Sequence, residues 1–287
     1  MTIATLIAAD RLDERLVESA LARVTGASLS GWIEPGSAAD LRVSDVAAAR
    51  SALEGWEGVD LIALPRGRDI RLFVADMDST MIGQECIDEL ADYAGVKPQV
   101  ADITERAMRG ELDFVGALRE RVALLEGLPE ATIAQCLKER VTLNPGAGTL
   151  VRTLTAEGVR TLLVSGGFTA FAEPVGELIG FDEVEANVLE VAGGVLTGKV
   201  SGRIVDSGYK KAALIGRREH LSLGHAQTMA IGDGANDLPM VEEAGFGLAY
   251  RAKPVLAASA DARLDNHPLS ALLWALGIPS DRWIQAG

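Results

Sequence analysis

The segment LFVADMDSTMIGQE, residues 72–85, places Asp76, Asp78 and Glu85 directly after a short apolar run. A carboxylate in such a position could cap a helix, hold a metal ion or attack an electrophile. A chain that only had to end a buried strand could use glycine or asparagine there. The choice among the three roles depends on what else the fold brings to the same place.

Two other polar positions follow apolar runs in the same way. Ser165 comes after TLLV, and Asp233 comes after TMAIG. Continuous apolar runs of this length favour strands buried on both faces of a parallel sheet, with helical patterns between them. Such sheets bind ligands beyond the carboxyl ends of their strands, at a topological switch point. Asp76, Ser165 and Asp233 all fall at those ends, so we expect them to converge.

The predicted fold class is α/β: a doubly wound (Rossmann-like) parallel sheet core with a helical cap insertion, plus a small N-terminal α+β module. In residues 71–287, the predicted strands are the short apolar runs 71–76, 160–167, 228–234 and 245–250. Two insertions interrupt their alternation with helices. Residues from about 84 to 143 have a helical pattern and no strand signal, and 186–202 indicates a hairpin around Gly193 and Gly194.

The N-terminal module, residues 1–70, contains no cluster of residues that suggests chemistry. Its pattern predicts a strand over 2–8, a helix within 11–26, a second helix from Val46 to Trp56, and a closing strand over 59–65. PRGRD, residues 65–69, is typical of a linker to the second domain.

The composition limits the number of domains, the partners and the cellular compartment that we expect. The 287 residues are 48% hydrophobic, enough for one large core or two domains. The net charge of −14 argues against nucleic acid or an anionic membrane surface as a partner, and no apolar run reaches the roughly 18 residues of a membrane span. The N-terminus lacks a basic n-region, and Cys86 and Cys136 form no metal spacing, so we expect a reduced, cytoplasmic protein. An anionic substrate would need a local positive site, and the chain has only six lysines.

Four ordered motifs and a cap segment resemble a known family. DMDST (76–80), LLVSGG (162–167), a downstream lysine and GDGANDLPM (232–240) are similar to the haloacid-dehalogenase superfamily of aspartyl-phosphate phosphatases. DMDSTMIGQE, GDGANDLPM and ITERAMRGELDFVGALRERVALL (103–125) look more closely like the phosphoserine phosphatase family. The resemblance covers about 71–275. It implies Mg²⁺-dependent hydrolysis of O-phosphoserine, the last step of serine biosynthesis, and it is compatible with a homodimer.

The resemblance gives the two aspartates separate roles. Asp76 would be the nucleophile, because a carboxylate is ionised at neutral pH and a covalent step splits one hard displacement into two easier ones. Asp78 would be general acid and then general base, because the serine alkoxide is too basic to leave unprotonated. That pairing requires a raised pKa at Asp78 while Asp76 stays charged beside the metal.

The implied metal ligands are carboxylates, since Mg²⁺ prefers oxygen. They are Asp76, Asp233 and the main-chain carbonyl of Asp78, with Asp237 close behind. Helix capping and turn formation would be the simpler explanation for Asp233 or Asp237 alone.

Ser165 and Gly166, with the following glycine, would cradle phosphate oxygens, although a glycine turn is the commoner explanation for such a triplet. Asn236, within GDGANDLPM, is implied as a further substrate-binding residue. Lys210 or Lys211 would supply positive charge to the phosphoryl group, and the family match favours Lys210.

The cap is expected to select the substrate. On a helix through FVGALRERVALL, Phe114, Leu118, Val122 and Leu125 form an apolar stripe that includes Arg121, while Arg119 points away. An arginine on such a face either extends to solvent or recognises a buried anion. The family match implies that Arg121 binds the substrate carboxylate and Glu85 the ammonium, with apolar contacts from Met108 and Phe114.

Two alternatives remain at this stage. A receiver-like signalling module also combines acidic residues, a hydroxyl and a lysine on a doubly wound sheet, but it is about half this size and lacks a helical insertion after the first strand. A related phosphatase or phosphotransferase could act on another small phosphate ester. Only the cap argues for an amino-acid substrate.

Overall fold

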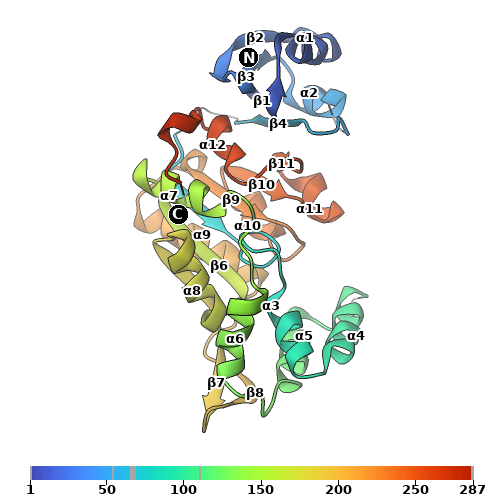
Figure 1. The fold of residues 1–287 in the computed structure, drawn as a ribbon, viewed down its shortest axis with the longest axis vertical. Helices are drawn as coiled ribbons and strands as arrows, with labels where there is room; N and C mark the ends of the chain where they lie inside the picture. The colour runs from blue at the N-terminus through green and yellow to red at the C-terminus, as the bar shows by residue number, and fades with distance from the viewer. Residues whose placement is uncertain (1, 54, 65–68, 110, 286–287) are drawn as a thin grey trace.

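The computed structural model describes residues 2–53, 55–64, 69–109 and 111–285, which form two sheets with helices around them (Figure 1). One sheet has four antiparallel strands in the order β2-β3-β1-β4. The other has seven strands in the order β11-β10-β9-β5-β6-β7-β8. The predicted fold class is confirmed.

The four-stranded sheet and two helices make up the N-terminal module. Its elements are β1 (Thr2–Leu12), α1 (Glu14–Arg23), β2 (Ser28–Glu34), β3 (Gly36–Val43), α2 (Val46–Leu53) and β4 (Asp60–Ala63). Residues 4 to 8 of β1 are all buried because both faces of the sheet are covered. Leu6 packs in the core under α1 and α2, whereas Ile7 joins the larger core of the remaining chain.

Three details of the predicted module differ from the structure. The second helix ends at Leu53 rather than at Trp56. The first helix begins at Glu14, because β1 continues to Leu12 and the Asp13 carboxylate caps the helix by accepting from the Leu16 N–H at 2.8 Å. The strands β2 and β3 were not predicted, because their sequences are rich in serine, glycine and alanine rather than in β-branched residues. Residues 65–68 of the predicted linker lie outside the described residues.

The seven-stranded sheet is parallel except for its last strand. Its members are β5 (Leu72–Ala75), β6 (Arg160–Phe168), β7 (Glu183–Ala192), β8 (Val195–Ser201), β9 (Thr228–Gly232), β10 (Phe246–Tyr250) and β11 (Ala262–Leu264). Strand β5 lies in the middle, between β6 and β9. The chain runs outward from β5 through β6 and β7, then returns to β9 on the other side. This reversal makes the carboxyl end of β5 the topological switch point.

Helices cover this sheet and extend beyond it. They are α3 (Cys86–Tyr93), α4 (Lys97–Met108), α5 (Phe114–Ala123), α6 (Ala131–Arg140), α7 (Ala147–Ala156), α8 (Thr169–Ile179), α9 (Ser207–His220), α10 (Leu238–Glu243), α11 (Pro254–Ser259) and α12 (Ala271–Ala275), with 3-10 turns at His225–Gln227 and Ser280–Arg282. In Figure 1, α4 and α5 stand apart from the sheet, on the side opposite the N-terminal module. Among the described residues, no helix is long and apolar enough to cross a membrane.

The predicted hairpin is part of the main sheet rather than a separate insertion. The first half of β7 pairs in parallel with β6, and its second half turns back antiparallel into β8. Gly193 and Gly194 form the turn with φ angles of 63° and 79°, which favour glycine. The hairpin also supports the cap, since the Gly127 N–H donates to the Leu196 carbonyl at 2.9 Å.

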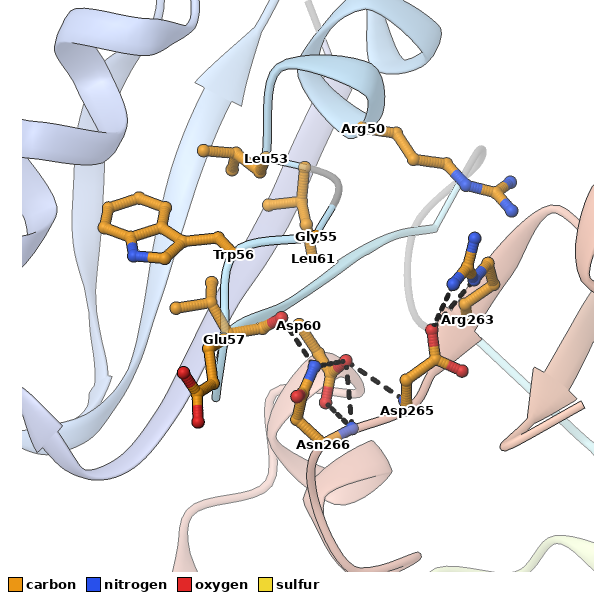
Figure 2. Close-up of a pocket in the computed structure, with 11 residues that line it drawn as sticks. Arg50, Leu53, Gly55, Trp56, Glu57, Asp60, Leu61, Arg263, Asp265 and Asn266 are labelled. Carbon is orange, nitrogen blue, oxygen red and sulfur yellow. Dashed lines mark hydrogen bonds and ion pairs between the residues drawn. The ribbon is translucent and has the colours of Figure 1, made fainter.

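The N-terminal module is joined to the rest of the chain through polar contacts at β4. The Asp60 carboxylate accepts hydrogen bonds from the backbone of Asp265 and Asn266 and from the Asn266 side chain (Figure 2). Its Oδ2 also lies 2.7 Å from His267 Nδ1. A cavity of about 380 Å³ lies at this junction, lined by residues of both parts.

Candidate active site

Asp76 and Asp233 stand at the ends of neighbouring strands at the switch point. Asp76 follows β5, and its N–H donates to the Ile231 carbonyl of β9 at 3.1 Å. Asp233 follows the last residue of β9. Both side chains are buried. The parallel register of β5 and β9 thus brings two acidic residues together that are far apart in the sequence.

Asp237 completes an acidic cluster with Asp76 and Asp233. Among the described residues, these three form one group in which a carboxylate oxygen of each lies within 4.8 Å of the others. Asp237 Oδ2 accepts from the N–H groups of Asp233 and Gly234 at 3.1 and 3.2 Å, which fixes the loop after β9. The side chain of Asp78 is not part of this group.

Lys210 of α9 is a buried cation at the cluster. It is 1% exposed, and its Nζ donates to Asp76 Oδ1 at 2.5 Å and to Asp237 Oδ1 at 2.7 Å. Burial alone would lower the pKa of Lys210, but attraction to Asp237 and Asp76 raises it above its ordinary value. Lys211 is 43% exposed and pairs with Glu243 on the surface. Of the two lysines left open by the sequence, the structure therefore brings Lys210 to Asp76.

The buried acids exceed the positive charge that faces them. Burial, followed by repulsion from Asp237, raises the pKa of Asp76 well above its ordinary value, and burial also raises the pKa of Asp233. A divalent cation would relieve this repulsion, and carboxylate oxygens are the donors that Mg²⁺ or Ca²⁺ prefers. The donor set at the cluster fits such an ion.

Asp78 occupies a different environment from Asp76. Burial raises the pKa of Asp78 to about 7, and repulsion from Glu85 adds to the shift. Its Oδ1 is enclosed without a hydrogen-bond partner among the described residues. Gly167 lies against its other oxygen, since a Cβ at Gly167 would stand 2.9 Å from Asp78 Oδ2. A carboxyl group that titrates near neutral pH is suited to both giving and taking a proton.

The Ser165 segment lies beside these acids at the end of β6. Ser165 is buried, and its Oγ accepts from the Gly167 N–H at 2.9 Å. Asn187 of β7 holds the turn, because its Nδ2 donates to the Gly166 carbonyl at 2.8 Å and its Oδ1 accepts from the Val205 N–H. Sequence reasoning missed Asn187, since an asparagine inside a hairpin pattern gives no signal of its distant partners.

The cap approaches the same place from α5. A Cβ at Gly166 would lie 3.2 Å from the Phe114 ring, so the two residues are in contact range. Leu118 and Val122 are buried as expected for the apolar stripe. Met108 ends α4, but its side chain lies outside what the structure describes.

Arg121 and Glu85 both lie close enough to Asp78 for their charges to interact with it. Burial lowers the pKa of Arg121, and attraction to Asp88, Glu85 and Asp78 opposes the shift. Glu85 Oε1 accepts from the Ser79 hydroxyl at 2.9 Å, and burial raises the pKa of Glu85. A positive and a negative side chain are thus placed near Asp78 from different elements.

Lys253 and Asn236 lie next to the cluster. Lys253 Nζ lies 3.2 Å from Asp233 Oδ2, while 63% of the lysine side chain is exposed. Asn236 Nδ2 donates to Asp237 Oδ1 at 3.4 Å. Sequence reasoning missed Lys253, although it is one of few lysines and follows the end of β10.

A comparison with protein families matches the segment that carries this site. The sequence model of the haloacid dehalogenase-like hydrolases matches residues 73–242. The chain belongs to this family.

Several relatives share more than this segment. The chain is 44% identical over 258 residues to phosphoserine phosphatase SerB2 of Mycobacterium tuberculosis, covering 89% of this chain and 62% of that protein. It is 45% identical over 210 residues to the phosphoserine phosphatase of Albidiferax ferrireducens, covering 71% and 89% of the two chains. The crystal structure of a probable phosphoserine phosphatase from Vibrio cholerae has a TM-score of 0.81 at 30% identity and covers 96% of this chain and 86% of its own.

Proposed function

We propose that this protein is a Mg²⁺-dependent phosphoserine phosphatase that hydrolyses O-phosphoserine to serine and phosphate. The observation that carries the proposal is the buried pair of Asp76 and Lys210 within the acidic cluster at the switch point. The names of relatives that are 44% and 45% identical support the same substrate.

Asp76 is the proposed nucleophile. Its carboxylate oxygen attacks phosphorus, an Asp76 aspartyl-phosphate forms, and the bond from phosphorus to the serine oxygen breaks. Lys210 holds Asp76 Oδ1 in place and supplies fixed positive charge beside the phosphoryl oxygens. Asp76, Asp233 and the main-chain carbonyl of Asp78, with Asp237 behind them, are the groups that would hold Mg²⁺, which supplies positive charge between nucleophile and phosphate.

Asp78 is the proposed proton carrier. Its raised pKa of about 7 leaves a proton available for the leaving serine oxygen. The resulting carboxylate then takes a proton from the water that attacks phosphorus, and the bond to Asp76 breaks. Ser165 and the N–H groups of the adjoining glycine turn are suited to hold the phosphate oxygens during both steps.

Arg121 and Glu85 are proposed to select the amino-acid part of the substrate. The guanidinium matches the fork of a carboxylate, and Glu85 offers a negative partner for the ammonium. Met108, Phe114 and Asn236 are proposed as further contacts with the substrate. We also propose a cytoplasmic location, a homodimer, and a division into a module of residues 1–70 and a phosphatase domain of residues 71–287 with a cap at about 84–143.

The sharpest test compares two arginines of α5 on two substrates. Arg121→Ala should lower kcat/KM for O-phosphoserine by about 100-fold or more, because a buried charged partner is lost. It should barely change kcat/KM for phosphoethanolamine, which has the ammonium but no carboxylate. Arg119 is exposed on the same helix, so Arg119→Ala is the matched control and should leave both substrates unaffected.

Equal losses on both substrates would reduce Arg121 to a structural residue of the cap. A wild-type preference for another phosphate monoester over O-phosphoserine would contradict the proposed substrate. Steady-state phosphate release measures all of these combinations.

A further inference from the structure

Helix α11 touches the N-terminal module at one end and the acidic cluster at the other. Arg50 of α2 donates from Nη1 to the Ala260 carbonyl at 2.7 Å and from Nη2 to the Ala257 carbonyl at 2.8 Å. These carbonyls belong to the C-terminal end of α11. The last carbonyls of a helix have no partner within it, so a guanidinium there stabilises the end of the helix.

Lys253 stands at the N-terminal end of the same helix. Its N–H donates to the Asp233 carbonyl at 2.8 Å, and its Nζ pairs with Asp233 Oδ2. Its own carbonyl accepts from the N–H groups of Leu256 and Ala257, so Lys253 is the N-cap of α11. The backbone and the side chain of Lys253 are therefore both tied to one acid of the cluster.

The helix between these two contacts is short. Six residues, Pro254–Ser259, form less than two turns, and such a segment is not stable by itself in water. Leu256 packs one face of the helix into the core, so the contacts at the two ends fix how the helix lies on that face. Among the described residues, Arg50 holds one end and Asp233 the other.

We infer that Arg50 of the N-terminal module positions Lys253 at Asp233 through α11, and that the module thereby sets the affinity of the acidic cluster for Mg²⁺. Figure 2 shows Arg50 extending from α2 across the junction toward the other part of the chain. The inference rests on the proposed metal site and goes beyond it, because Arg50 and Lys253 are assigned to positioning rather than to metal binding.

The direction of the effect follows from charge. Lys253 shares the Asp233 carboxylate with any cation bound at the cluster, so the two compete. Removing the ammonium should tighten Mg²⁺ binding by about fivefold, the size of a screened interaction between a monovalent and a divalent cation near a surface. If α11 is held less firmly, Lys253 should contact Asp233 less often, and its competition with Mg²⁺ should become weaker.

The test is a double-mutant cycle on the full-length chain, with the Mg²⁺ dissociation constant measured by calorimetry in the absence of substrate. Lys253→Met should tighten binding about fivefold and Arg50→Ala about twofold. The double variant should match Lys253→Met alone, because Arg50 acts through Lys253. Arg15→Ala, an exposed arginine on α1, is the matched control and should leave the constant unchanged.

Hydrogen exchange supplies a second measurement. Arg50→Ala should increase the exchange rates of the α11 amides while those of β1 keep their protection, which separates a local effect from unfolding of the module. Additive effects of the two substitutions, or an unchanged constant in a folded Arg50→Ala variant, would overturn the inference alone. Failure of the wild-type chain to bind Mg²⁺ would overturn the metal site itself.

Discussion

Asp60 and Asp76 are both buried carboxylates facing a basic side chain, yet their surroundings differ in kind. Asp60 accepts from the N–H groups of Asp265 and Asn266, from the Asn266 side chain, and from His267 Nδ1. Burial alone would raise the pKa of Asp60, but these hydrogen bonds lower it overall. The opposite shift is found at Asp76, whose pKa is raised.

The difference is between an acid whose hydrogen bonds are all made and an acid held among repelling charges. His267 Nε2 accepts from the Ala9 N–H at 3.0 Å, so its Nδ1 carries the hydrogen toward Asp60. The polar side-chain atoms of Asp60 and His267 thus all have hydrogen-bond partners, and the pair joins the N-terminal module to the rest of the chain. Asp76 has Lys210 but also two neighbouring acids that repel it, an arrangement that is common at functional sites. A buried Asp–His contact is thus no evidence of catalysis by itself.

The largest expected effect comes from removing the charge of Asp76. Asp76→Asn keeps the shape of the side chain but removes the proposed nucleophile, so kcat should fall by about 10⁴-fold. Phosphate release measures the rate. The isosteric change at the other acid, Asp60→Asn, is the control and should keep most of the activity at a temperature where it is folded. Substantial turnover by Asp76→Asn would rule out the aspartyl-phosphate route.

The same two variants should move stability in opposite directions. Asp60→Asn turns an amide toward the donors of Asn266 and His267, so the free energy of unfolding should fall by about 2 to 3 kcal/mol. The raised pKa of Asp76 means that its contribution to stability is present below its unfolded pKa and is lost as pH rises through its folded pKa.

At pH 7 the Asp76→Asn substitution should therefore raise the free energy of unfolding, by about 1 kcal/mol. Urea titration of both variants measures the two changes. A loss of stability in Asp76→Asn as large as that in Asp60→Asn would show that the two acids play the same structural role.

A smaller effect concerns pH. In the proposed mechanism Asp78 carries a proton when serine leaves. Because its pKa is about 7, the single-turnover rate of serine release should fall about tenfold per pH unit above about 7. Asp78→Asn should be slow at every pH and lack this alkaline decline. The substrate phosphate ionises near pH 6, so its titration falls on the acid side of the profile. A rate that stays constant between pH 7 and 9 would contradict the role of Asp78.

Much of the reactive region could be predicted from the sequence because its signals are local. Apolar runs that end in Asp76, Ser165 and Asp233 predict parallel strands, and the carboxyl ends of such strands meet at one edge. The helical pattern placed Arg121 on the buried stripe of α5, and the structure leaves it partly buried near Asp78. The catalytic and binding roles of these residues stay predictions that the experiments above test.

Other features were decided only by tertiary packing. Neighbouring residues on a helix point about 100° apart, so packing alone turns Lys210 inward and leaves Lys211 on the surface. Lys253 reaches Asp233 because parallel pairing of β9 and β10 aligns the ends of two strands. Asp60 and His267 stand 207 residues apart, and nothing in either local sequence specifies the other. The sequence alone thus determined which chemical groups end the central strands, through hydrophobic periodicity along each segment. Which groups face one another was decided by long-range packing, since contacts between distant segments leave no periodic trace in the chain.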